Sequence, residues 1–313
     1  MGKTISIAMT TFNGGMFLRE QLESIYNQTK VPDEVVVCDD GSTDDTIAIL
    51  EEYKETKGLK LYVNGVQLGV NQNFYKAISL CTGDYIALCD QDDVWLPKKL
   101  QITYDKMCEL DGDYPVAVSS RCINVDEELH PLTEYRKIED SSCYADTFID
   151  ITCSQGCSLM INMQLKNIVL STQGQIGDRC MFDSYIAKVA AMRGVKYNIG
   201  DKLMLYRHHS RNVVAKVNSR LSFREHILVQ GRFRGFLKDE QILDAVSTYI
   251  VHKQHIENSR INIFLSRLVQ IKETKNKALC YAIVLRMPEF SFGKRLKIVL
   301  STMVVDVLKC ILK

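Results

Sequence analysis

Three groups of polar residues in the first hundred positions have the types and the spacing needed to bind a charged ligand. Residues 10–13, 39–42 and 90–93 each follow a short apolar run, and they supply hydroxyl, amide and carboxylate groups. Carboxylates bind divalent cations such as Mg²⁺ and Mn²⁺, and the oxygens of a bound phosphate can complete the coordination of the ion. The group at 90–93 is the most acidic of the three, and it is the natural place for a cation that neutralises a diphosphate.

The acidic group contains Asp90, Asp92 and Asp93 directly after the apolar run 85–89. Short Asp-x-Asp strings are often acidic turns that precede a helix, and Pro97 suits the first turn of such a helix. The preceding run is apolar enough to be a buried strand, and this position favours metal binding over a simple turn.

Asp39 and Asp40 close the second apolar run, where a carboxylate can accept a hydrogen bond from a nucleobase N–H. Gly41 and Ser42 form a good turn and helix N-cap whether or not a ligand binds. Two acidic pairs at the ends of two strands of one sheet favour a ligand-binding role for both.

The elements that must position these groups are short strands alternating with helices over the first 120 residues. The predicted strands are 5–9, 34–38, 60–63, 85–89 and 116–119, and the predicted helices are 16–27, 44–53, 71–81 and 97–110. This alternation predicts an α/β fold with a mostly parallel, doubly wound sheet. Such sheets bind ligands beyond the carboxyl ends of their strands, so the three polar groups should meet at one edge.

Composition and charge are those of a globular protein with two dissimilar parts. The 313 residues are 46% hydrophobic and 25% charged, and the 11 cysteines form no C-x-x-C pair and no zinc-ligand cluster. The start of the chain has no signal-peptide pattern, so we predict a cytoplasmic protein. Residues 1–195 carry 17 Lys+Arg and 29 Asp+Glu, a balance of −12, whereas residues 196–313 carry 22 and 9, a balance of +13.

The basic C-terminal third has helical patterns in place of the alternation, and we predict a boundary that divides 1–215 from a basic amphipathic helical region at 216–313. Its apolar run at 298–308 is shorter than the roughly 20 residues needed to cross a bilayer. Two roles are open for this region. It can lie on an anionic membrane at the inner face of the cell membrane, or it can pack on the catalytic domain or form a homodimer.

Four motifs in order along the chain, at residues 6–13, 37–44, 83–95 and 206–212, together resemble glycosyltransferase family 2. The string Asp-Gln-Asp-Asp-Val-Trp at 90–95 is similar to that of the rhamnosyltransferase-like branch. The resemblance covers residues 4–215. It implies a glycosyltransferase A fold, a nucleotide-diphosphate sugar as donor, a glycan acceptor, a divalent cation (Mn²⁺ or Mg²⁺), and inversion at the anomeric carbon. The helical patterns of 216–313 add a C-terminal helical extension, and membrane contact there would present a lipid-linked acceptor.

The resemblance also implies roles for residues on the nucleoside side of the site. Thr11 and Asn13 would line the nucleoside pocket, and Asp40 would contact the base with Asp39 beside it. Asn73 matches the start of a helix that packs over the nucleotide.

On the metal side, Asp90 would bind the ribose or the sugar, and Asp92 would be the principal metal ligand with Asp93 supporting the loop. His209 and Arg207 fit a loop that closes on the diphosphate, because imidazole can ligate a metal and guanidinium can bind phosphate oxygens.

An inverting transfer needs a general base, and the family places an acid in a motif typically read as His-Asp-Trp-Trp. The corresponding string here is Phe-Asp-Ser-Tyr at 182–185, which makes Asp183 the candidate base. Asp178 is a competing assignment, and Asp183 can alternatively cap the helix that follows. Gly156 and Cys157 match a family Gly-Cys strand near the donor sugar, although packing would explain the pair equally well.

Other functions fit the sequence less well. A sugar nucleotidyltransferase shares this type of sheet but normally opens with a glycine-rich phosphate loop, which residues 10–15 do not form. A dinucleotide-dependent oxidoreductase would need G-x-G-x-x-G after the first strand. A catalytically inactive, membrane-associated sugar-nucleotide-binding protein is disfavoured because Asp92 and Asp183 are intact. Nucleic-acid binding is disfavoured because the basic residues lie outside the sheet region and form no known motif.

Overall fold

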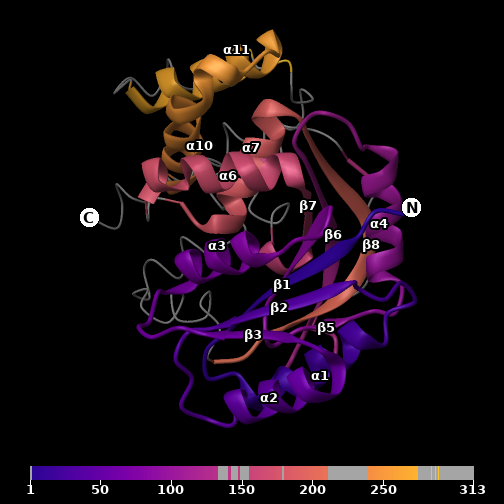
Figure 1. The fold of residues 1–313 in the computed structure, drawn as a ribbon. Coiled ribbons are helices and arrows are strands. Elements are labelled where there is room, and N and C mark those ends of the chain that lie inside the picture. Colours follow the sequence, from indigo (N-terminus) through magenta and orange to yellow (C-terminus); the bar gives the residue numbers. More distant parts are fainter. Residues whose placement is uncertain are drawn as a thin grey trace.

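The computed structural model describes residues 2–132, 140–141, 147–148, 155–177, 180–210 and 239–273, together with positions 283, 286 and 288. These residues form an α/β fold built on one central sheet, with helices on both of its faces (Figure 1).

The central sheet has eight strands in the order β3-β2-β1-β4-β7-β6-β8-β5. Their bounds are β1 Ile5–Thr11, β2 Glu34–Asp39, β3 Lys60–Val63, β4 Tyr85–Cys89, β5 Val94–Trp95, β6 Val116–Val125, β7 Leu159–Asn162 and β8 Val195–Arg207. The pairs β1–β2, β1–β4, β2–β3 and β6–β8 are parallel, whereas β7 is antiparallel to both β4 and β6, and β5 is antiparallel to β8.

Strand direction decides which residues reach the functional edge of the sheet. Because β1, β2 and β4 are parallel, their carboxyl ends lie at one edge, and the residues that follow them are neighbours there. β7 runs the other way, so its beginning lies at that same edge, and Gly156 and Cys157 reach it from the amino-terminal side of the strand.

Helices cover both faces of the sheet. One face packs against α1 (Gly15–Tyr26), α2 (Thr46–Lys57) and α4 (Lys99–Glu109), and the other against α3 (Val70–Leu80), α6 (Met163–Ile176) and α7 (Phe182–Arg193) (Figure 1). Short 3-10 turns lie at Gly156–Ser158 and Lys253–His255.

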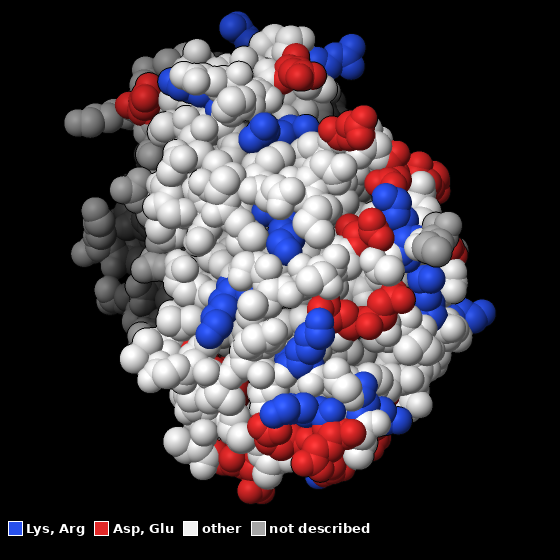
Figure 2. Space-filling view, viewed as in Figure 1, with Lys and Arg blue, Asp and Glu red and all other residues white. Residues whose placement is uncertain are grey.

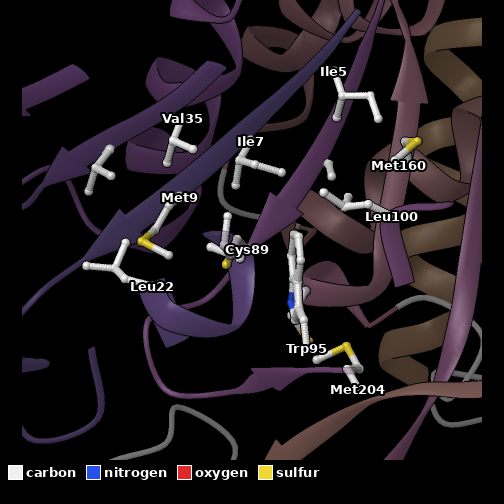
Figure 3. Close-up of a cluster of buried hydrophobic side chains, with 14 of the residues drawn as sticks. Ile5, Ile7, Met9, Leu22, Val35, Cys89, Trp95, Leu100, Met160 and Met204 are labelled. Carbon is white, nitrogen blue, oxygen red and sulfur yellow. The ribbon is translucent and has the colours of Figure 1, made fainter. Parts of the chain in front are cut away.

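The core forms on both faces of the sheet because the central strands carry apolar side chains on both sides. This is usual for parallel strands that have helices on both faces. Ile5, Ile7 and Met9 of β1 are fully buried on the face of α1 and α4, in the same cluster as Trp95 (Figure 3). Ala8, the alternate residue of the same strand, is fully buried on the face of α3. This rigid centre fixes where each strand ends, and therefore where the polar groups lie.

The mostly parallel α/β fold predicted from the sequence is confirmed. The five predicted strands are present, and β1, β2 and β6 extend beyond the predicted ends. The four predicted helices are also present, with ends that differ by a few residues. The sequence did not indicate β5, residues 195–201 of β8 or the reversed direction of β7. Gly156 and Cys157, which the family resemblance placed in a strand, form a 3-10 turn directly before β7.

The described part of the C-terminal third is a helical hairpin of α10 (Asp239–His252) and α11 (Ser259–Glu273), stacked on α6 and α7 (Figure 1). The apolar side of α11 faces the protein, with Ile261, Phe264, Leu265 and Leu268 at most 5% exposed. The predicted boundary at 215 and the apolar run 298–308 lie outside the described residues. Among the described helices, none is long and apolar enough to cross a membrane.

Surface charge is mixed on the face shown in Figure 2. Acidic side chains gather over the end formed by α1 and α2, with basic side chains beside them. Arg19 pairs with Glu52 and Lys54 pairs with Glu51 in this area, so much of its charge is balanced locally.

Candidate active site

The ends of β1, β2 and β4 bring the three polar groups together at one edge of the sheet, as the sequence predicts. The loop after β1 and the loop after β2 form one side, which we call the nucleoside side. The loop after β4, the end of β8 and the start of α7 form the other, which we call the cation side.

Asp39 organises the nucleoside side and is fully buried. Its Oδ2 accepts hydrogen bonds from the hydroxyls of Thr11 (2.7 Å) and Ser42 (2.5 Å), and its Oδ1 accepts from the backbone N–H of Gly41 (3.0 Å) and Ser42 (2.8 Å). Gly41 has φ +87°, a conformation that glycine adopts without strain. These four bonds hold the loops after β1 and β2 in one arrangement.

Asp40 is also buried and anchors the loop that precedes α3. Its Oδ1 accepts from Leu68 N (2.7 Å) and from the Asn64 amide (2.8 Å), and its Oδ2 accepts from Gly69 N (2.8 Å). A carboxylate with three donors is well satisfied, and the loop 64–69 is held against the end of β2.

Asn73 and Asn13 complete this side. The Asn73 amide donates to Cys38 O (2.9 Å) and its Oδ1 accepts from Asn64 (2.9 Å), so the side chain ties α3 to β2. Asn13 has φ +48°, and its Oδ1 accepts from Thr43 N (2.8 Å). The structure therefore brings together all five residues predicted for the nucleoside side, and their contact with a nucleoside stays a prediction.

On the cation side, the two predicted metal ligands lie in contact. Asp92 Oδ2 and His209 Nε2 are 2.8 Å apart, although 117 residues separate them in the chain. Phe17 of α1 packs against the His209 ring with centroids 4.9 Å apart, and so helps to fix the orientation of the imidazole.

Arg207, predicted to bind the diphosphate, is 2% exposed. Its guanidinium donates to Asp92 O (2.9 Å), to Glu127 O and to the Glu20 carboxylate, and it stacks on the Phe17 ring at 4.4 Å. In this arrangement Arg207 holds the Asp92 loop in place. Binding of a phosphate by Arg207 stays a prediction, and it would require the guanidinium to exchange some of these partners.

Asp90, Asp93 and Cys157 form a cluster whose ligand atoms all lie within 4.8 Å of one another. Burial, together with the charges of Asp92 and Asp183, raises the pKa of Asp90 to about 8. Burial and the charges of Asp92 and Asp90 raise the pKa of Asp93 well above its usual value. Asp93 Oδ1 accepts from Arg207 N (3.2 Å), whereas its buried Oδ2 has no hydrogen-bond partner in the described part of the chain.

Two groups on this side offer ligands to a divalent cation. Asp90 and Asp93 offer carboxylate oxygens beside the Cys157 thiol, whose pKa burial raises, and the Asp92–His209 pair offers a carboxylate and an imidazole. Carboxylates and imidazole are ligands that Mn²⁺ accepts, and a positive ion would relieve the repulsion that helps to raise the pKa of the crowded carboxyls. The Oδ2 of Asp93, which has no hydrogen-bond partner among the described residues, lies in the same cluster as Asp90. A positive ion there would stabilise the ionised forms of Asp90 and Asp93.

Asp183, the candidate base, lies in the first turn of α7 and touches the Gly-Cys segment. Its Oδ2 accepts from Gly156 N (3.0 Å) and its Oδ1 from Ser184 N (2.7 Å). A Cβ at position 156 would lie 2.6 Å from the Phe182 ring, so the close approach requires glycine. Burial raises the pKa of Asp183 to about 6, against the opposing effect of these hydrogen bonds and of Lys188. Asp178 lies outside the described residues.

With this geometry known, comparison with characterised families identifies the protein class. The profile described as glycosyl transferase family 2 matches residues 6–168. The chain belongs to glycosyl transferase family 2. The family resemblance predicted from the four motifs is thereby confirmed.

Individual relatives agree with this family. The chain is 27% identical over 241 residues to the dTDP-rhamnosyl transferase RfbG of Shigella flexneri, covering 72% of this chain and 80% of that protein. It is 30% identical over 103 residues to the UDP-Glc:alpha-D-GlcNAc-diphosphoundecaprenol beta-1,3-glucosyltransferase WfgD of Escherichia coli, covering 33% of this chain and 40% of the relative. The fold is similar to that of S. aureus TarS residues 1–349 in complex with UDP-GlcNAc, with a TM-score of 0.55, 16% identity, and coverage of 97% of this chain and 90% of that chain.

Several residues of this family 2 transferase that shape the site were not apparent from its sequence. Phe17 was unremarkable as one apolar residue of a helix. Lys99 is 1% exposed, its ammonium lies 3.9 Å from the centroid of the Trp95 ring, and burial lowers its pKa to about 8. Gln91 stands between two predicted site residues, and its side-chain amide bonds to the backbone of Phe12 in the opposite loop. Only the contacts across the fold reveal these three residues.

Proposed function

We propose that this transferase moves a sugar from a nucleotide-diphosphate donor to a glycan acceptor with inversion at the anomeric carbon, in the synthesis of a cell-surface polysaccharide. One observation carries the proposal: Asp183, a carboxylate suited to general-base work, accepts a hydrogen bond from Gly156 N (3.0 Å), next to Cys157, whose sulfur lies within 4.8 Å of the ligand atoms of Asp90 and Asp93. The charge of Asp183 also contributes to the raised pKa of Asp90.

In the proposed reaction, the acceptor hydroxyl attacks the anomeric carbon and passes its proton to Asp183. The bond between that carbon and the diphosphate oxygen breaks, and its electron pair leaves with the nucleotide. A base with a pKa near the working pH is efficient in such a step, and a pKa of about 6 meets this condition. A divalent cation held by Asp92 and His209, with Asp90 nearby, would stabilise the negative charge of the leaving diphosphate.

The remaining site residues position the donor in this proposal. Thr11, Asn13, Asp39, Asp40 and Asn73 would form the nucleoside wall, and Arg207 would support the diphosphate directly or through Asp92. The existing hydrogen bonds mean that this wall is formed before the donor binds, which reduces the entropy lost on binding.

For the donor we propose dTDP-rhamnose first, because RfbG is named as a dTDP-rhamnosyl transferase and covers most of this chain. Uridine diphosphate sugars rank second, because WfgD is named for UDP-Glc and TarS was crystallised with UDP-GlcNAc. Purified protein with Mn²⁺ would be incubated with a panel of nucleotide sugars, and release of nucleoside diphosphate would be measured. Turnover of one donor above the others identifies the substrate, and absence of hydrolysis and of nucleotide binding across the panel would refute the proposal.

For the acceptor we propose a lipid-linked glycan, reached by peripheral binding of the basic C-terminal third to the membrane. The charge balance of +13 over 196–313 supports this, since each Lys or Arg near an anionic surface can contribute roughly 1 kcal/mol. Removal of residues 290–313 should weaken sedimentation with anionic liposomes and preserve donor hydrolysis. A fall in melting temperature or a change in oligomer mass, with no liposome binding by the full chain, would show instead that this segment packs on the protein or forms a homodimer.

A further inference from the structure

Gln91 makes two hydrogen bonds to the backbone of a single residue in the opposite loop. Its Oε1 accepts from Phe12 N (2.8 Å), and its Nε2 donates to Phe12 O (3.1 Å). Gln91 lies between Asp90 and Asp92 on the cation side, and Phe12 lies between Thr11 and Asn13 on the nucleoside side. The primary amide of Gln91 therefore joins the two sides directly.

This amide continues the pairing of two strands beyond their ends. The register of β1 with β4 finishes at Met9 and Cys89, and Gln91 then satisfies both backbone groups of Phe12 much as a neighbouring strand would. A side chain can do this only if it lies flat against the backbone that it pairs with.

The residue at position 14 leaves room for this arrangement. A Cβ on Gly14 would lie 2.1 Å from Gln91 Oε1 and 2.3 Å from its Cδ. Gly14 has φ −104° and ψ 6°, which alanine also adopts, so its backbone conformation does not require glycine. The missing Cβ at Gly14 is explained by the space that the Gln91 amide fills.

We propose that Gln91 is a positioning residue that couples cation binding to nucleotide binding by tying the Asp90–Asp92 loop to the Thr11–Asn13 loop. The inference rests on the proposed function, because it assigns the two loops to the cation and to the nucleotide. When a cation orders the loop after β4, the amide transmits that order to the loop after β1. By thermodynamic reciprocity, a bound nucleotide strengthens cation binding by the same factor.

The link itself is tested without any ligand by a double-mutant cycle on thermal or urea unfolding. Gly14→Ala should destabilise the protein by displacing the amide, and Gln91→Ala should destabilise it by removing the amide. In the double variant, the Gly14→Ala change should cost much less, because the space is already empty. Additive effects in the double variant would show that the two positions do not interact, and would overturn the proposal.

The coupling is measured by calorimetric titration of nucleoside diphosphate, as the ratio of affinities with and without Mn²⁺. Coupling between sites is typically about 5- to 150-fold, and we expect a wild-type ratio in this range. In Gln91→Ala and in Gly14→Ala, the ratio should fall about threefold or more below that of the wild type, while affinity without Mn²⁺ changes less and the part of the ratio that comes from direct contact between cation and diphosphate remains. Gln91→Glu keeps the acceptor for Phe12 N and loses the donor to Phe12 O, so its ratio should be intermediate.

Gln101→Ala is the matched control, because that side-chain amide binds Asp105 on the surface of α4, and its ratio should equal that of the wild type. A wild-type ratio retained in Gln91→Ala would overturn the coupling while the proposed function stands. A wild-type protein that binds no nucleotide with or without Mn²⁺ would refute the proposed function, and the coupling with it.

Discussion

The two sides of the site contrast in how fully their carboxylates are satisfied. On the nucleoside side, Asp39 accepts four hydrogen bonds and Asp40 accepts three, all from nearby loops. On the cation side, Asp90 and Asp93 lie close together with raised pKa values, and one oxygen of Asp93 has no partner in the described structure. Both sides contain acidic residues, but only on the second do burial and neighbouring carboxylates disfavour the ionised form of the acids.

This difference teaches that acidic residues at strand ends divide into two kinds. A carboxylate saturated with backbone N–H groups builds the wall of a site and stabilises the fold. Carboxylates that repel one another in a buried cluster destabilise the protein and gain by binding a cation or a proton.

The largest effect should come from Asp183→Asn, which keeps the shape of the side chain and removes the proposed base. Sugar transfer should fall by about two to four orders of magnitude, while nucleotide affinity changes little. The measurement is the initial rate with the donor found in the panel, beside titration of the nucleotide. Asp178→Asn serves as the control, and the assignment of the base is wrong if that variant is the inactive one.

Asp92→Ala should remove the gain in nucleotide affinity that we expect Mn²⁺ to give the wild type, because the proposed principal cation ligand is lost. We expect the loss to be on the order of tenfold or more, equivalent to at least about 1.4 kcal/mol of binding free energy. Titration of nucleoside diphosphate with and without Mn²⁺ measures it. Affinity that Mn²⁺ still enhances as in the wild type would show that Asp92 does not bind the ion.

Asp40→Asn and Asp93→Asn should change the free energy of unfolding in different ways. The new amide at position 40 would place a donor against the donors of Leu68, Gly69 or Asn64, at a cost of about 1–3 kcal/mol. At position 93 the amide can keep the bond from Arg207 N and cannot ionise, so the cost of a carboxyl in a site that disfavours its charge is removed and stability in EDTA should be unchanged or increased. Urea unfolding at neutral pH measures the free energy of unfolding of each variant. If both variants lose the same stability, the carboxylates of the two sides do not differ in the way described.

The smallest effect is the pH dependence of the metal-free protein. Because folding raises the pKa of Asp90 to about 8 and that of Asp183 to about 6, the folded state binds more protons than the unfolded state from about pH 4 up to those values. Each protonated carboxyl therefore contributes stability at low pH. The contribution of Asp183 is lost as the pH rises through about 6, and the contribution of Asp90 is lost as the pH rises through about 8.

Since Asp90 keeps part of its surface accessible and solvent screens it, we expect a loss on the order of 1 kcal/mol between pH 6 and 8 in EDTA. Mn²⁺ should oppose this loss, and Asp90→Asn should flatten it. A melting temperature that increases from pH 6 to pH 8 in EDTA would show that the fold does not hold Asp90 protonated.

The place of the site could be predicted from the sequence, because it depends on where the strands end. The apolar runs predicted β1, β2 and β4, and parallel pairing then required residues 10–13, 39–42 and 90–93 to meet. What the sequence could not supply was the partner of each carboxylate. Asp39 and Asp93 have the same chemistry in the chain, and only the fold shows that one receives four donors and the other retains an unpartnered oxygen.

The long-range contacts were hidden for a different reason. The pairing of Asp92 with His209 followed from the family resemblance and not from spacing, since 117 residues separate the two. Gln91 and Phe17 belong to types that are ordinary in loops and helices, and their roles arise from tertiary packing alone. The direction of β7 was equally hidden, because a four-residue apolar run does not reveal which way it pairs.

That reversed strand has a consequence for how the molecule can diversify. β6 ends and β7 begins at the edge of the sheet where β1, β2 and β4 end. The connection between Val125 and Leu159 therefore leaves the sheet and returns to it at the edge that carries the candidate site. Lengthening such a connection costs little, roughly 0.6 kcal/mol for each doubling of its length. Related chains can therefore acquire or lose residues in this one connection and present a new surface to incoming substrates, while the strands that hold the carboxylates keep their register.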